Sequence, residues 1–163
     1  MNRAVASFVY VGLLRPAPGS WGSLAALPVA WLLYALGGPW LVLVAVPLLF
    51  AAGLHAARAC TAGQADHDPS WIVVDEVVGQ WIALLPVLFG AWYTGALVTA
   101  LWPGWVAAFV LFRLFDILKP SLVGAADRRG DVLGLMLDDV WAGLFAALGV
   151  VLLAALAHLP VIL

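Results

Sequence analysis

The chain has 163 residues, of which 66% are apolar and 10% are charged, and its formal net charge is −2. Soluble domains are about half apolar and about a quarter charged, so this composition predicts an integral membrane protein. The sequence has no basic stripe, which argues against a nucleic-acid partner. Its single cysteine excludes an internal disulfide and a multi-cysteine metal site.

Five apolar segments predict an all-α fold, a polytopic membrane helical bundle that forms one domain over residues 1–163. A membrane-spanning helix needs about 20 apolar residues. A shorter apolar piece at residues 4–14 predicts a helix that lies at the membrane interface or packs in the bundle. The five expected segments are Trp21–Leu36, Pro39–Ala57, Trp71–Phe89, Ala96–Phe115 and Leu133–Leu159.

Proline and glycine divide these segments. Pro28 and Pro47 interrupt the first two, which we expect to tilt or to cross only partly. The connections are predicted at Gly37-Gly38-Pro39, Thr61–Ser70, Gly90–Gly95 and Lys119–Asp131.

The basic residues predict the orientation. If all five segments cross, every Lys and Arg lies at or near one side, which the positive-inside rule assigns to the cytoplasm. The C-terminus then lies outside. In this topology the third and fifth segments begin, and the fourth ends, at the cytoplasmic side.

All nine acidic residues fall between positions 66 and 139, and five interrupt apolar segments: Asp75, Glu76, Asp116, Asp138 and Asp139. A carboxylate at the centre of a membrane helix costs roughly 2.5–3.5 kcal/mol on insertion scales. The predicted topology brings all five to one depth, near the cytoplasmic surface. Such a polyanionic cluster indicates a divalent cation.

Two acidic pairs share a spacing to glycine. Gly79 lies four residues after Asp75, and Gly143 lies four after Asp139. Helices packed through these glycines would bring four carboxylates together. We therefore expect Asp75, Glu76, Asp138 and Asp139 to hold one or two Mg²⁺ ions. The alternatives are a hydrogen-bonded helix contact for the first pair and helix N-terminal caps for the second.

The motif Arg113-x-x-Asp116-x-x-Lys119 predicts catalytic groups at the end of the fourth segment. Arg113 and Lys119 suit a phosphate, and Asp116 is expected to be a metal ligand or the base that orients water. The alternative is an internal salt bridge, with Lys119 reaching towards the headgroups. Asp68, beside His67, is a further candidate for proton transfer or metal binding, with a solvated loop as the alternative.

Residues 16–23, Pro-Ala-Pro-Gly-Ser-Trp-Gly-Ser, precede the first segment. Such a loop can direct backbone N–H groups and hydroxyls at an anion, although it also simply starts helices. The predicted phosphate-binding residues here are Gly19, Ser20, Gly22 and Ser23.

The ordered set of motifs over about residues 13–145 resembles the phosphatidylglycerophosphatase A family. The set comprises P-G-S-x-G-S, H-D-x-x-x-I-V-V-D-E-x-x-G-x-W, F-R-x-x-D-x-x-K-P, D-R and D-D-x-x-A-G. Ser20 stands where the family pattern usually has Thr. The resemblance implies an all-helical, Mg²⁺-dependent enzyme of the bacterial inner membrane. Its expected reaction converts phosphatidylglycerophosphate to phosphatidylglycerol, a step of phospholipid biosynthesis.

Two other functions are also compatible with these residues. Intramembrane acids also mark ion pathways, so a small cation transporter or channel is the first alternative. The second is a phosphatase for another lipid phosphate monoester. Asp127, Arg128, Arg129 and Asp131 are expected to lie mostly at the surface, with the two arginines facing anionic lipid.

Overall fold

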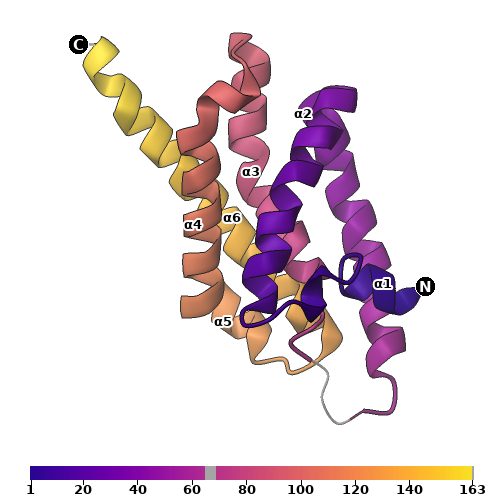
Figure 1. Ribbon diagram of the computed structural model, residues 1–163. Helices are drawn as coiled ribbons and strands as arrows, with labels where there is room; N and C mark the ends of the chain where they lie inside the picture. Colours follow the sequence, from indigo (N-terminus) through magenta and orange to yellow (C-terminus); the bar gives the residue numbers. More distant parts are fainter. Residues whose placement is uncertain (65–68, 163) are drawn as a thin grey trace.

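A computed structural model describes residues 1–64 and 69–162 and confirms the all-α prediction, since these residues form helices and no strand (Figure 1). The elements are α1 (Asn2–Ala6), η1 (Val11–Leu13), α2 (Pro18–Thr61), α3 (Val74–Thr94), η2 (Val98–Leu101), α4 (Trp102–Leu118), α5 (Leu122–Asp127) and α6 (Val132–Ile162).

Helix α2 consists of two arms that meet at a glycine pair. Gly38 has φ +67° and ψ −168°, a conformation open essentially to glycine, and Gly37 also leaves the helical region. A Cβ built on Gly38 would lie 2.9 Å from the ring of Trp92. Figure 1 shows the chain reversing here, so that the two arms run side by side. The predicted boundary between the first two segments is confirmed.

Four helical stretches of the described chain are long and apolar enough to span a membrane: α2, α3, Val98–Leu118 and Val132–His158. Because α2 contains two arms, these stretches correspond to the five predicted segments. The chain is therefore a membrane protein with a helical bundle as its architecture.

Several predicted boundaries were wrong. Pro28 and Pro47 lie inside the arms of α2 without ending them, as prolines do in membrane helices whose neighbours satisfy the freed carbonyls. Helix α3 begins at Val74 rather than Trp71, and it passes through Gly90 to end at Thr94, with Gly95 as its C-cap in the left-handed region. The predicted loop Lys119–Asp131 contains a further short helix, α5.

The N-terminal piece is not one helix over residues 4–14. Helix α1 ends at Ala6, because the Ser7 hydroxyl donates to the carbonyl of Arg3 (2.7 Å) and accepts the N–H of Tyr10 (3.0 Å). Residues 8–10 then adopt positive φ. The carbonyl of Ala6 accepts the N–H of Val73 at 2.9 Å, which ties this segment to the start of α3.

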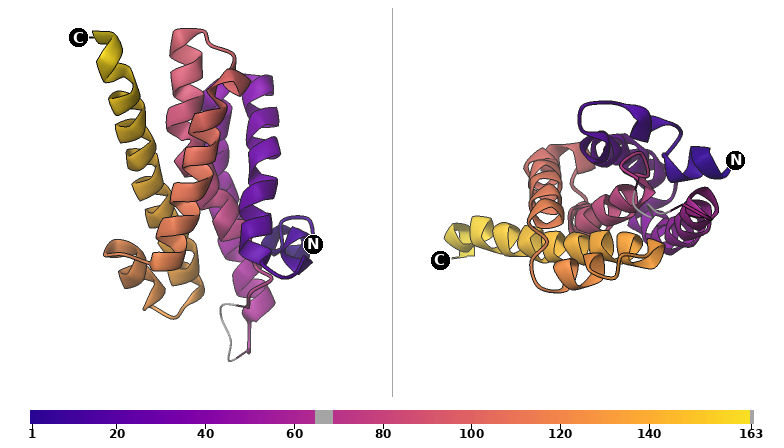
Figure 2. Two further views of the ribbon diagram at one scale, coloured as in Figure 1. Left: turned by 60° about the vertical axis from the view of Figure 1, so that its left-hand side comes forward. Right: turned by 90° about the horizontal axis from the view of Figure 1, so that it is seen from below.

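Helix α3 forms the centre of the bundle. Of its membrane-spanning stretch, 72% is buried, against 17–22% for the others. It packs against both arms of α2 and against α4 and α6, and Figure 2 shows this arrangement along the bundle and from below. The indole N–H of Trp81 donates to the carbonyl of Ala26 at 3.0 Å in this core.

Replacing Trp81 with Phe is expected to lower the free energy of unfolding by about 1–2 kcal/mol, because a buried hydrogen bond and part of the ring packing are lost. Denaturant unfolding in detergent micelles, followed by circular dichroism, measures this change. Trp102→Phe is the control, since Trp102 is 65% exposed, and it should stay within about 0.5 kcal/mol of the parent. Equal losses in both variants would contradict the assignment.

Candidate active site

The first turn of α2 forms one side of the site. The helix begins at Pro18, so Gly19 to Ser23 belong to the helix, and the prediction that they form a loop before it was wrong. The N-cap residue, Ala17, makes no side-chain capping hydrogen bond. Backbone N–H groups at such a helix end, together with the helix dipole, favour an anion.

The four predicted loop residues divide into two pairs. Gly19 and Ser20 line the cavity described below. Gly22 does not: a Cβ there would lie 2.8 Å from Cβ of Val73, so this glycine allows a close helix contact. The Ser23 hydroxyl is buried and donates to the carbonyl of Gly19 at 2.9 Å. Because the helix starts early, its periodicity directs Gly22 and Ser23 away from the cavity.

Asp75 and Glu76 lie in the first turn of α3, where the helix dipole favours negative charge. Asp75 is only 3% exposed. Gly19 faces this turn, and a Cβ added to it would overlap the Glu76 carboxylate and lie 3.2 Å from Nη1 of Arg113. The glycine therefore allows the start of α2 to approach both charged groups closely.

Asp138 and Asp139 are buried two turns inside α6, so the alternative in which they cap this helix was wrong. Asp131 takes that place, because its carboxylate accepts the N–H of Gly134 at 2.7 Å. Asp138 and Asp139 lie further along the helix and face the interior of the bundle.

The predicted glycine contact between the third and fifth segments is confirmed. A Cβ built on Gly79 would lie 2.6 Å from the backbone oxygen of Asp139, and one on Gly143 would lie 3.0 Å from Cα of Gly79. Glycines that allow backbones to touch are typical of membrane helix packing. This contact brings Asp139 of α6 beside the two acids of α3.

Asp75, Glu76 and Asp139 form a candidate metal group. One carboxylate oxygen from each lies within 4.8 Å of the others. Asp138 is engaged differently: its Oδ2 accepts from Lys119 at 2.9 Å, and its Oδ1 accepts the N–H of Asp139 at 2.9 Å. The role of Asp138 as a metal ligand stays a prediction, although it lines the same cavity.

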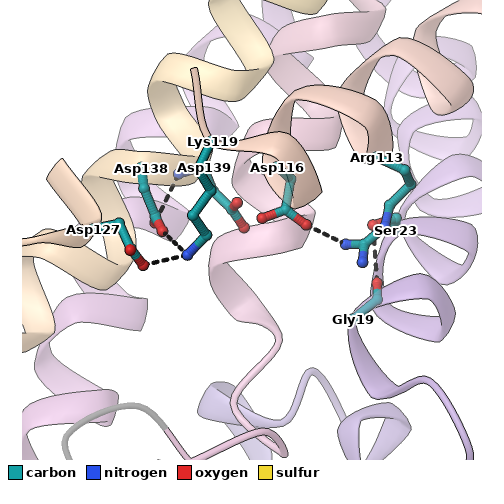
Figure 3. A network of polar contacts seen from close by, with 8 residues as sticks. All are labelled: Gly19, Ser23, Arg113, Asp116, Lys119, Asp127, Asp138 and Asp139. Carbon is teal, nitrogen blue, oxygen red and sulfur yellow. Dashed lines mark hydrogen bonds and ion pairs between the residues drawn. The ribbon is translucent and has the colours of Figure 1, made fainter. Parts of the chain in front are cut away.

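Helix α4 contributes Arg113 and Asp116, which form an ion pair with 2.7 Å between Nη1 and Oδ2 (Figure 3). Both side chains are largely buried and line the cavity. The salt bridge that the sequence left as an alternative is therefore present. It leaves Arg113 facing the cavity, so it does not remove this residue as an anion-binding group.

Lys119 is the C-cap of α4, and its ammonium lies between Asp138 and Asp127, as Figure 3 shows. Partial burial opposes the charged form, but hydrogen bonds to Asp127 and Asp138 outweigh it and raise the pKa of Lys119 above its ordinary value. These partners therefore favour the positively charged form of Lys119 at the cavity. Asp127 is exposed, as predicted, but its carboxylate also binds Lys119.

These groups surround a cavity of about 270 Å³. Five residues that line it were not found from the sequence: Ala17, Pro18, Ser70, Ile72 and Leu135. Only Ser70 had a sequence feature that could have indicated a site residue, because it follows Asp68-Pro69 directly before the third segment. The site residues predicted from the sequence that line the cavity are Gly19, Ser20, Asp75, Glu76, Arg113, Asp116, Lys119, Asp138 and Asp139.

Polar atoms without partners gather at this cavity. Within the described residues, the buried side-chain nitrogen and oxygen atoms that lack a hydrogen bond belong to Asp75, Glu76, Arg113 and Gln80, of which all but Gln80 line the cavity. Nη1 of Arg113 is among them, because its ion pair with Asp116 lacks hydrogen-bond geometry. Buried polar groups almost always have a partner, so this cluster indicates a polar ligand or ion. Asp68 lies outside the described residues.

Comparison with known proteins gives one family. The family model for phosphatidylglycerophosphatase A matches residues 4–154. A phosphatidylglycerophosphatase A from Haemophilus influenzae is 38% identical over 138 residues, which cover 84% of this chain and 78% of that protein. The Escherichia coli protein of the same name is 37% identical, with 83% and 73% covered.

Another relative has a different name. A candidate phosphatidylinositol-3-phosphatase from Bacteroides thetaiotaomicron is 38% identical over 135 residues, which cover 80% of this chain and 79% of that protein. No solved structure matches the chain.

Proposed function

This chain belongs to the phosphatidylglycerophosphatase A family, and we propose that it hydrolyses phosphatidylglycerophosphate to phosphatidylglycerol and phosphate. As a family member it is a phosphoric monoester hydrolase. The proposal includes dependence on Mg²⁺, a role in phospholipid biosynthesis, and a location in the bacterial inner membrane with the site on the cytoplasmic side.

The proposal rests on one arrangement above all, which is a group of three carboxylates beside two cations and a helix N-terminus in a single cavity. Three carboxylates held this closely repel one another unless a proton or a cation lies between them. Mg²⁺ takes oxygen ligands and binds through a few carboxylates plus a substrate phosphate. Asp75 Oδ1 and Glu76 Oε2 lack partners and are suitable donors.

The residues of the chain have separable tasks in this mechanism. Asp75, Glu76 and Asp139 would hold Mg²⁺, with Asp138 as a further candidate. When bound, the ion would polarise the phosphoryl group and lower the pKa of a bound water. Arg113 and Lys119 neutralise the charge on the phosphate, since phosphoryl transfer depends mostly on positioning and electrostatics.

Asp116 is the candidate base or water-orienting group. Its ion pair with Arg113 holds its carboxylate at the cavity. The first-turn N–H groups of α2 at Gly19 and Ser20 supply uncharged donors to the phosphate from the opposite helix. The donor set therefore surrounds a phosphate with two cations and backbone N–H groups.

The position of the cavity suits a lipid substrate. Elements α1 and α5, the start of α2 and the end of α4 lie at one end of the bundle, and the C-terminus lies at the other (Figure 1). This end contains the charged connections, so the positive-inside rule supports a cytoplasmic location. A phosphate at headgroup depth can enter the cavity while its acyl chains remain in the bilayer.

The decisive experiment compares hydrolysis of phosphatidylglycerophosphate, phosphatidic acid and phosphatidylinositol 3-phosphate by the purified protein, each with Mg²⁺ and with EDTA. We expect phosphate release from phosphatidylglycerophosphate at least tenfold faster than from the other two, and its loss in EDTA. Equal rates on all three lipids would contradict the headgroup assignment. Cation flux in proteoliposomes without hydrolysis of any of them would favour the transporter.

A further inference from the structure

Asp127 lies next to the cavity and is connected to it by Lys119. Its carboxylate binds the ammonium of Lys119, yet Asp127 itself does not line the cavity. We propose that Asp127 is a positioning residue, which holds Lys119 in place to receive the phosphate. This inference rests on the proposed function, because it assigns a task to a residue outside the groups that contact the substrate.

The turn between α4 and α5 creates this contact. Lys119 has φ +46° and ψ 53°, and Ser121 has φ +50°, so two non-glycine residues within three positions have positive φ. Such conformations are unfavourable for residues other than glycine and persist only where surrounding contacts hold them. Helix α5 then returns towards the turn, and a Cβ on Gly124 would lie 2.5 Å from the carbonyl oxygen of Lys119.

The consequence is that the last residue of α5 faces the first residue after α4. Asp127 and Lys119 are eight positions apart, and their side chains meet at the edge of the cavity, as Figure 3 shows. A helix of six residues is too short to be stable alone, so its packing fixes where Asp127 lies. Three of its residues, Val123, Gly124 and Ala126, are buried.

The ammonium group of Lys119 has three donors. Asp127 accepts one and Asp138 accepts another, which leaves one for a ligand in the cavity that Lys119 lines. The two carboxylates lie in different environments, because the side chain of Asp127 is 42% exposed and that of Asp138 is 5% exposed. Asp127 thus holds the lysine from the solvent side and Asp138 from the interior.

Two physical effects of removing the Asp127 charge have opposite signs. A lost negative charge near the cavity would by itself strengthen phosphate binding through Coulomb attraction. Loss of one of its two carboxylate partners gives the long side chain of Lys119 more freedom, and ordering it again opposes binding. The positioning role requires the second effect to be larger, so the sign of the change in phosphate affinity decides the matter.

The experiment uses the full chain in detergent with Asp127→Asn, and Asp131→Asn as the matched control. Asp131 lies in the same connection and pairs with Arg129, and Asn keeps its capping ability. We expect Asp127→Asn to raise KM and the inhibition constant of inorganic phosphate about 5–10-fold, with kcat within about threefold. Asp127→Glu should restore at least half of the loss, and Asp131→Asn should match the parent.

Two further readouts separate positioning from a structural role. Mn²⁺ binding and the thermal unfolding midpoint of Asp127→Asn should equal those of the parent. Phosphate inhibition that is unchanged or stronger would overturn the proposal, and so would loss of Mn²⁺ binding or of the folded state. Calorimetric titration with inorganic phosphate tests Asp127 even if the parent hydrolyses none of the lipids, so failure of the proposed function is distinguishable.

Discussion

Replacing Asp139 with Asn is expected to lower phosphate release by about 10³-fold, equivalent to about 4 kcal/mol of transition-state stabilisation. Asp139 is buried and lies with Asp75 and Glu76 in the group of three carboxylates. Asn keeps the size of the side chain but removes the charge, so the candidate metal loses a ligand. Steady-state kinetics with phosphatidylglycerophosphate over a range of Mg²⁺ concentrations measure the effect.

Glu76→Gln tests the same group from α3 and should have a similar effect. In both variants, Mn²⁺ binding measured by electron paramagnetic resonance should weaken at least tenfold while circular dichroism stays unchanged. Near-normal turnover in both variants would exclude the assigned metal group. Normal Mn²⁺ binding with lost turnover would instead place these two carboxylates in proton transfer.

Replacing Gly143 with Ala is expected to reduce the free energy of unfolding by about 2–3 kcal/mol and activity by about 10²-fold. The added Cβ would lie 3.0 Å from Cα of Gly79 and would overlap that residue's backbone carbonyl, so α3 and α6 must separate. Backbone atoms cannot rotate away as a side chain can. Separation moves Asp139 away from Asp75 and Glu76, which explains why activity falls with stability.

Gly90→Ala is the matched control, because it makes the same change in the interior of α3 with nothing within 4 Å of the added Cβ. Alanine has the higher helix propensity, so this variant should be as stable as the parent or more stable by up to about 1 kcal/mol. Unfolding in detergent and phosphate release measure both variants. Equal behaviour of the two would show that the glycine contact does not position the acids.

Much of the architecture was predictable because membrane helices follow local rules. Each span needs about 20 apolar residues with its backbone hydrogen bonds satisfied internally, so composition alone locates it. The reversal at Gly37–Gly38 follows from the conformational freedom of glycine beside Pro39. The Gly79–Gly143 contact was predictable from the four-residue spacing between acid and glycine in two segments.

Other features depend on particular side-chain and backbone contacts that the pattern of apolar segments does not reveal. The end of α1 follows from the Ser7 hydroxyl and from the bond between Ala6 and Val73, which no periodicity reveals. Gly22 and Ser23 looked like loop residues, but the early start of α2 turned them into packing positions. The missed partner of Lys119, Asp127, is brought there by a left-handed turn and a six-residue helix.

The apolar segments and the positions of the charges suffice to predict a helical membrane bundle with acids and cations at one end, because lipid restricts which residues can span it. They do not determine which carboxylate faces which partner. In the folded bundle Asp75, Glu76 and Asp139 meet, while Asp138 binds Lys119. Adjacent acids on one helix point about 100° apart, and a close contact through glycine selects which of them faces the neighbouring helix.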